Sequence, residues 1–259
     1  MTTQAARIQV ERRDGVGWIT LDHPPLNVIT TTMTRAMRRA VEEFDADGET
    51  AVIVIGAAGE RAFAASADVG EHTAELVREL NDELFALARC LVRSEGKPRI
   101  AAVKGICSGG ANEVAFACDF VVARDDARFA LPEIGIGAVG ALGALMMARF
   151  TSNGKAMELG LGGDWMGAQE AREHGLVAQV LPSEGFDEAL ARYLRRFTTK
   201  SIAAMCLGRR QLRTLLEPSL DANLTALSKS LMDESIALED YQEGVNAFLE
   251  KRKPIWRHR

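Results

Sequence analysis

The segment from residue 99 to residue 133 constrains the fold most, because it places a strand, a turn of small residues, a helix start and two glutamates in one short span. Residues 99–103 (RIAAV) follow Pro98 and predict a short buried strand. Residues 105–111 (GICSGGA) predict a turn at which a ligand can touch the main chain, before residues 112–116 (NEVAF) continue as a helix. The first amides of such a helix are unpaired, which suits an anion or an oxygen that gains negative charge.

The two glutamates of this segment both lie in apolar sequence. Glu113 falls one turn inside the predicted helix, where apolar neighbours raise the proton affinity of a carboxylate. Glu133 follows Pro132, which fixes its own φ and biases Leu131 toward extended geometry, so that the acid leaves the preceding strand in a set direction. Two such acids beside an amide-rich turn indicate proton transfer next to a stabilised oxyanion.

The rest of the chain predicts strands and helices in alternation, followed by helices alone. An Asp14-Gly15 turn between apolar runs predicts a hairpin of residues 8–12 and 16–21. Further strands are expected at 51–55, 119–123, 128–130 and 176–181, and helices at 33–44, 74–92, 155–161, 168–174, 186–198, 203–216, 219–237 and 240–250. The uncharged run at 134–148 predicts a loop that leads into a buried helix. We therefore expect an α/β core in residues 1–198 and a helical C-terminal region in residues 199–259.

Composition excludes several classes of protein. The chain has 259 residues, of which 47% are hydrophobic and 26% charged, and its net charge of −5 gives no general reason to bind nucleic acid. The first 12 residues lack a hydrophobic signal core, and the uncharged run at 134–148 is shorter than the roughly 20 residues of a membrane-spanning helix. Neither the cysteines nor the four histidines show the spacing of metal ligands. We expect a soluble, cytoplasmic protein with free thiols and no metal.

Four motifs in order resemble the crotonase superfamily, the group of enoyl-CoA hydratases and isomerases. Residues 62–69 (AFAASADV) are similar to the family's first oxyanion loop, and residues 105–113 (GICSGGANE) to its second. Residues 131–135 (LPEIG) match the segment of the second catalytic acid, and residues 248–254 (FLEKRKP) the end of the C-terminal helix. Each motif alone is weak, but four in register along nearly the whole chain are specific.

The resemblance implies a spiral of strand-strand-helix turns, a helical trimerisation region, and a homotrimer or a dimer of trimers. It implies an acyl-CoA thioester as ligand, so that coenzyme A belongs to the substrate and no separate cofactor, nucleic acid or membrane partner is expected. The amides of Ala67 and Gly110 would hold the thioester oxygen, while Glu113 and Glu133 would add water across the 2,3 double bond of a 2-enoyl-CoA. The remaining positions implied to line the substrate are Leu26, Ala65, Ser66, Asp68, Val69, Gly70, Gly109, Gly137, Phe248 and Lys251.

The sequence departs from the family pattern at several positions. Ser66 stands where glycine is usual, and its Cβ disturbs the loop unless φ there is negative. Ala111 replaces the third glycine of the second loop, and residues 138–147 differ from the usual proline- and glycine-rich segment. These changes predict an altered acyl pocket, with room for a larger or unusual acyl group.

Other functions fit parts of the same sequence. An isomerase or another crotonase-type enzyme could use the same two acids. The G-x-C-x-G pattern around Cys107, with Asp164 and His174 later in the chain, is also the order of a hydrolase triad with a thiol nucleophile. A non-catalytic binder of acyl-CoA or RNA with the same fold is a third possibility, against which the two intact acids argue.

Overall fold

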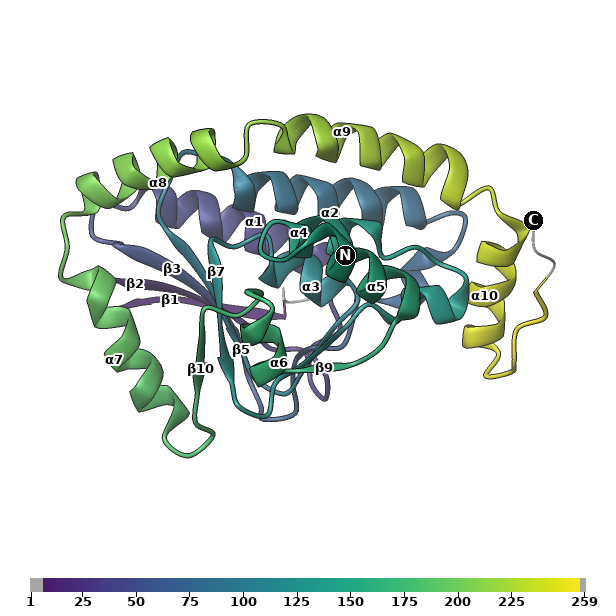
Figure 1. Cartoon of the computed structure of the whole chain (residues 1–259), viewed down its shortest axis with the longest axis horizontal. Helices are drawn as coiled ribbons and strands as arrows, with labels where there is room; N and C mark the ends of the chain where they lie inside the picture. Colours follow the sequence, from purple (N-terminus) through teal and green to yellow (C-terminus); the bar gives the residue numbers. More distant parts are fainter. Residues whose placement is uncertain (1–6, 257–259) are drawn as a thin grey trace, which may run out of the picture.

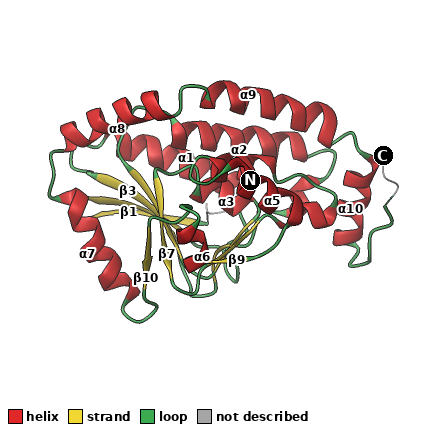
Figure 2. Cartoon of the chain, in the orientation of Figure 1, coloured by secondary structure: helices red, strands yellow, loops and turns green. Residues whose placement is uncertain are grey.

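The protein, described by a computed structural model over residues 7–256, is built around two mixed β-sheets (Figures 1 and 2). The larger sheet has the strand order β1-β2-β3-β5-β7-β10, in which only β1 and β2 are antiparallel. Its strands are β1 (Ile8–Arg13), β2 (Val16–Leu21), β3 (Val52–Ala57), β5 (Arg99–Val103), β7 (Phe120–Arg124) and β10 (Gln179–Leu181). The smaller sheet has the order β4-β6-β8-β9. Its strands are β4 (Ala62–Ala64), β6 (Ile106–Ser108), β8 (Arg128–Ala130) and β9 (Met166–Gly167).

Helices cover the sheets and extend beyond them. The helices are α1 (Thr31–Ala46), α2 (Val77–Val92), α3 (Gly110–Ala115), α4 (Ala141–Ala148), α5 (Asn153–Gly162), α6 (Ala168–Glu173), α7 (Phe186–Thr198), α8 (Ile202–Leu216), α9 (Leu220–Ser230) and α10 (Glu239–Leu249). Two short 3-10 helices, η1 (Val69–His72) and η2 (Pro132–Ile136), and a π-helical turn, η3 (Leu231–Ser235), connect them. Figure 1 shows α8 and α9 along one edge of the molecule, with α10 at the far end.

The expected hairpin and first helix are confirmed. Asp14 and Gly15 both have positive φ, 54° and 75°, as a tight turn between antiparallel strands requires. Thr30 caps α1 by accepting the amide of Met33. The predicted apolar face of this helix, from Met33 to Phe44, is buried.

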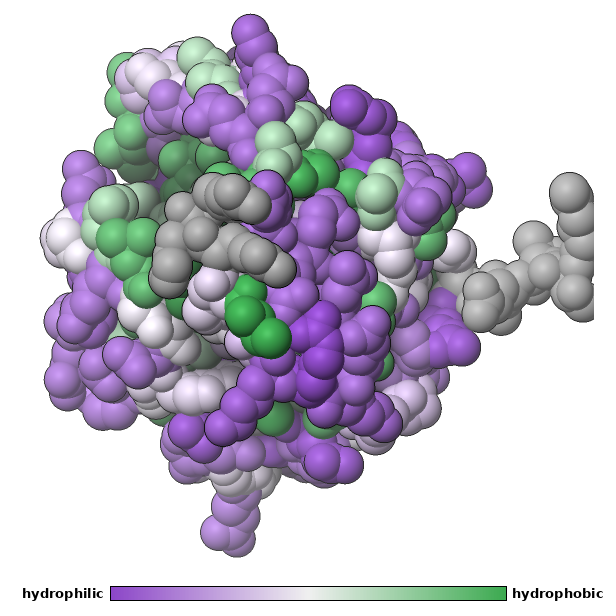
Figure 3. All heavy atoms as spheres, turned by 90° about the vertical axis from the view of Figure 1, so that its right-hand side faces the viewer, coloured by the Kyte–Doolittle hydropathy of each residue, from purple (hydrophilic) through white to green (hydrophobic). Residues whose placement is uncertain are grey.

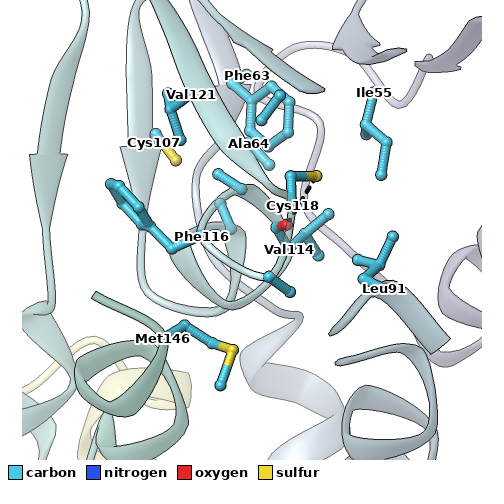
Figure 4. Close-up of a cluster of buried hydrophobic side chains, with 14 of the residues drawn as sticks. Ile55, Phe63, Ala64, Leu91, Cys107, Val114, Phe116, Cys118, Val121 and Met146 are labelled. Atoms are coloured by element: carbon cyan, nitrogen blue, oxygen red, sulfur yellow. Dashed lines mark hydrogen bonds between the residues drawn. The ribbon is translucent and has the colours of Figure 1, made fainter. Parts of the chain in front are cut away.

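The main hydrophobic core lies between the two sheets and surrounds α3. Figure 4 shows part of this core, where Phe116 at the end of α3 lies with Phe63 and Val121 from the strands and Leu91 from α2. These side chains are all 0% exposed. The small helix that bears Glu113 is thereby held on a rigid base, which is what a site with fixed geometry needs. On the opposite face of the larger sheet, α7 packs through its own apolar stripe.

Three of the predicted elements are wrong in detail. Residues 106–108, expected within a turn, form β6, because Gly105 (φ 59°) bends the chain out of the larger sheet and into the smaller one. The strand expected at 176–181 is limited to β10, since the amides of Leu176 and Val177 donate to the carbonyl of Ala171 and close α6 instead. The helix expected at 219–237 changes to the π-helical turn η3 after Ser230.

Buried ion pairs attach α8 to the core. Asp119 accepts hydrogen bonds from Arg209 (2.7 Å) and from Arg213 (2.7 Å), both nearly buried. Burial alone would raise the pKa of Asp119, but the two guanidinium groups outweigh burial and lower it. Arg209 also donates to the carbonyls of Ser94 and Glu95 beyond the end of α2. The C-terminal helices are therefore fixed to the α/β core by charge as well as by packing.

Candidate active site

The predicted catalytic residues meet at a small cavity of about 60 Å³ between α2, α3, α4 and the C-terminal segment. Its lining residues are Ser66, Ala67, His72, Asn81, Leu84, Phe85, Gly110, Glu113, Glu133, Ala138, Val139, Leu142, Leu231, Ile236 and Tyr241. Two wider hollows of about 710 Å³ each lie beneath α7 and beside α8, and their linings include no predicted site residue. We therefore take the smaller cavity, which the predicted catalytic residues line, as the candidate site.

Two backbone amides without partners come together at this cavity. Ile29 donates to the carbonyl of Ser66 (2.9 Å) and accepts from the amide of Asp68 (2.8 Å), so the intervening amide of Ala67 faces away from Ile29, as alternate groups of an extended chain do. Gly110 is the first residue of α3, and a Cβ placed on it would lie 3.0 Å from the nitrogen of Ala67. Neither amide donates a hydrogen bond within residues 7–256. An oxyanion hole requires two unpaired backbone amides on segments that lie next to each other, as these two do.

The two acids line the same cavity, and each follows one of two paired strands of the smaller sheet, β6 and β8. Glu113 belongs to α3 and Glu133 to η2, and the Oε2 atoms of both are buried without a hydrogen-bond partner in the described part of the chain. Burial, and then the charge of Glu133, raises the pKa of Glu113 to about 8. Burial raises the pKa of Glu133 to about 7. Near neutral pH one carboxyl is thus protonated while the other is ionised, the arrangement of an acid beside a base.

Glycines make room for the Glu133 carboxyl group. A Cβ on Gly109, whose φ is 58°, would lie 2.9 Å from Oε1 of Glu133, and a Cβ on Gly140 would lie 2.9 Å from Oε2. Gly137 (φ 69°) ends η2, and a Cβ there would lie 2.5 Å from the carbonyl oxygen of Asp240 in α10. Both glycines therefore shape the backbone around the acid, and their predicted contact with the substrate stays a prediction.

The other predicted substrate-lining residues fall into two groups. The first group does not line the cavity: Ala65 and Asp68 lie between β4 and η1, Val69 and Gly70 lie in η1, and Leu26 lies in the loop before α1. Ala65 donates to the carbonyl of Leu26 (3.0 Å), and the Asp68 side chain caps η1 by accepting from Gly70 (2.8 Å). In the second group, Phe248, 52% exposed, lies in the last turn of α10 and Lys251 lies just beyond the end of this helix, and neither lines the cavity. Their contacts with coenzyme A stay predictions.

Sequence reasoning missed most of the cavity wall. Leu84 and Phe85 belong to the buried face of α2, and Leu231, Ile236 and Tyr241 come from the C-terminal segment. An apolar residue in a helix predicts burial but not which cavity it lines, and the C-terminal residues carry no motif. The Tyr241 hydroxyl donates to the carbonyl of His72 (3.5 Å), so α10 lies over the site of its own chain. Figure 3 shows that the outer surface at this end of the molecule is mostly hydrophilic.

The structure contradicts the alternative of a thiol nucleophile. Cys107 is 0% exposed in β6, its thiol donates to Oδ1 of Asn112 (3.4 Å), and burial raises the pKa of the thiol well above its usual value. Asp164 and His174, its supposed partners, are exposed. Across the described range 7–256 we find no group of three or more potential ligands placed to bind a metal ion, and no helix long and apolar enough to span a membrane.

Comparisons with known proteins agree on one family. The sequence model described as "Enoyl-CoA hydratase/isomerase" matches residues 11–259. A "Probable enoyl-CoA hydratase" of Rhizobium meliloti is 36% identical over 258 residues, covering 96% of this chain and 97% of that protein. The "Enoyl-CoA hydratase domain-containing protein 3, mitochondrial" of Rattus norvegicus is 28% identical over 251 residues, covering 95% and 83%. The crystal structure of an enoyl-CoA hydratase from Mycobacterium avium subsp. paratuberculosis superposes with a TM-score of 0.86 at 27% identity, covering 97% and 98%.

Proposed function

The chain belongs to the enoyl-CoA hydratase/isomerase family, and from this premise we propose that it is an enoyl-CoA hydratase. The expected α/β fold of that family, with two mixed sheets and C-terminal helices, is confirmed. The family acts on acyl-CoA thioesters, which agrees with free amides and acids that share one cavity. The observation that carries the proposal is that Glu113 and Glu133 line this cavity together with Ala67 and Gly110.

The proposed reaction is the addition of water to a 2-enoyl-CoA. The amides of Ala67 and Gly110 donate to the thioester oxygen, which gains negative charge as the water oxygen bonds to carbon 3. The ionised member of the Glu113–Glu133 pair takes a proton from the water, and the protonated member delivers a proton to carbon 2. The product is a 3-hydroxyacyl-CoA, and the pair ends with the same number of protons as it began.

The size of the cavity favours a short acyl group. Its volume of about 60 Å³ is well below the roughly 150 Å³ of an apolar cavity that holds a benzene ring. Leu84, Phe85 and Leu142 form apolar walls, which suit an aliphatic chain. We therefore propose a substrate near the length of crotonyl-CoA, in contrast to the larger group that the sequence suggested.

A panel of 2-enoyl-CoA thioesters of increasing chain length tests both proposals. We expect the conjugated absorbance to fall, the product mass to rise by one water, and the rate to be highest for the shortest substrates. Glu113→Gln and Glu133→Gln should each slow hydration by roughly 10² or more, whereas Glu184→Gln, at an exposed turn, should leave the rate unchanged. A product of unchanged mass with a moved double bond would establish an isomerase instead.

Assembly and location stay predictions. We propose a homotrimer or a dimer of trimers, to be tested by light scattering of the purified protein. A cytoplasmic location is likewise proposed from the sequence, although the rat relative is described as mitochondrial.

A further inference from the structure

Ser66 holds an unusual backbone conformation at the edge of the candidate site. Its φ is 111°, and it is one of four non-glycine residues with positive φ in the described part of the chain. Asp14 and Asn27, two of the others, are residue types that tolerate the left-handed region, and their φ values of 54° and 52° fall within it. The φ of Ser66 lies well outside that region, where a side chain costs about 1–3 kcal/mol. Such strain at a cavity points to a role for the side chain.

The Ser66 side chain projects over Gly109 toward Glu133. A Cβ placed on Gly109 would lie 2.5 Å from Oγ of Ser66 and 2.9 Å from Oε1 of Glu133. Both oxygens therefore approach the same point, and their separation is within the reach of one bridging water, which spans up to about 5.5 Å between two partners. Ser66 and Glu133 also line the cavity together.

Glu133 has few other polar neighbours. The titratable side chains that share the cavity with it are Glu113 from α3, His72 at the end of η1 and Tyr241 from α10. His72 uses Nδ1 on the carbonyl of Asp68, and Tyr241 uses its hydroxyl on the carbonyl of His72. The charged residues of α5, Lys155 and Glu158, pair with each other. Gly109 and Gly140 present no side chain to the carboxyl group, so Ser66 is the hydroxyl best placed to act with it.

We propose that the Ser66 hydroxyl and the Glu133 carboxyl group together hold the water that adds to the substrate. The hydroxyl both donates and accepts hydrogen bonds, so it can orient the water whichever of the two acids is ionised. The inference rests on the proposed hydration, because only there is the held water a reactant. It gives a reason for a serine where the backbone conformation favours glycine.

Two substitutions at this position distinguish the effect of the hydroxyl from the effect of the strained backbone. Ser66→Ala removes the hydroxyl and keeps the strained Cβ, whereas Ser66→Gly removes both and relieves the strain. We expect each variant to lower kcat about tenfold or more, with KM changed by less than about threefold, because the loss affects a water and not the thioester contacts. Ser66→Gly should also raise Tm. A Ser66→Gly enzyme as fast as the original protein would overturn the inference.

A double-mutant cycle tests the partnership with Glu133. If Ser66 acts with Glu133 on one water, Ser66→Ala should slow Glu133→Gln by less than about twofold, although it slows the unaltered protein about tenfold. Equal losses in both backgrounds would overturn the inference.

A crystal structure provides a readout that does not depend on turnover. We expect a water within hydrogen-bond distance of both Oγ of Ser66 and a carboxyl oxygen of Glu133, and its loss in Ser66→Ala. If this water is present but no enoyl-CoA is hydrated, the proposed function fails while the water site stands. If hydration occurs without a water at that position, the site fails while the function stands.

Discussion

Replacing Gly109 by alanine is expected to disable the site while leaving the fold intact. The added methyl carbon would lie 2.5 Å from Oγ of Ser66 and 2.9 Å from Oε1 of Glu133, both closer than carbon and oxygen atoms approach in proteins. Glu133 cannot give way easily, since Gly140 packs against its other oxygen. The carboxyl group must therefore move by several tenths of an ångström or rotate out of the cavity.

Gly109→Ala is expected to lower both the stability and the activity of the protein. At φ 58° and ψ −132°, an alanine would occupy a sparsely populated region at a cost of about 1–3 kcal/mol, and the crowding adds about 1–3 kcal/mol. Displacement of a reacting group on the scale of 1 Å can cost about 10² in rate. We therefore expect Gly109→Ala to lower kcat about 10²-fold and to lower the free energy of unfolding by about 2–6 kcal/mol.

Urea unfolding and the rate of crotonyl-CoA hydration, measured on the same preparation, check this prediction. Gly48→Ala is the matched control, because Gly48 has an ordinary φ and no atom within 4 Å of an added Cβ. It should leave both quantities nearly unchanged. If Gly109→Ala retained the original rate, the placement of Glu133 over Gly109 would be refuted.

Three further predictions follow from the same structure. The pH profile of kcat/KM should be bell-shaped. The rate should rise as the acid pair loses its first proton near pH 7 and fall as the pair loses its second near pH 8. A flat profile between pH 6 and 9 would contradict the pairing of the two acids. Asp119→Asn should lower the free energy of unfolding, measured with urea, by about 3–5 kcal/mol, because it leaves Arg209 and Arg213 without their carboxylate. The control Asp221→Asn, at an exposed ion pair, should change the free energy of unfolding by less than about 1 kcal/mol. Because the pKa of Asp119 is lowered, its stabilisation should be present above its ordinary pKa and be lost as the pH falls through the lowered value. Cys107→Ser should keep hydration within about threefold, since a serine hydroxyl can also donate to Asn112; complete loss would return the thiol nucleophile to consideration.

The sequence predicted the acids and the amides better than their surroundings. Glu113 and Glu133 were recognisable because local sequence determines both their apolar setting and the turns that carry them. The strand β6 was missed because residues 106–108 are too few to show alternation, and its partners β4 and β8 lie far away in the chain. The family pattern identified Ser66 as a position where glycine is usual, but the sign of its φ required the structure.

The cavity wall was beyond sequence reasoning for a different reason. Tyr241 and Leu231 reach the site only because α9 and α10 fold back over α2 and η2. That path depends on the ion pairs of α8 with Asp119 and on packing between distant segments, and no local pattern encodes it. The lining of the cavity is therefore the part of the candidate site that required the structure.

Hydration of crotonyl-CoA in water enriched in oxygen-18 tests the central claim most directly. The account predicts that the heavy oxygen appears at carbon 3 of an intact 3-hydroxyacyl-CoA, and that its incorporation is lost in both Glu113→Gln and Glu133→Gln. Heavy oxygen found in a released carboxylic acid, or a product that contains none, would contradict it.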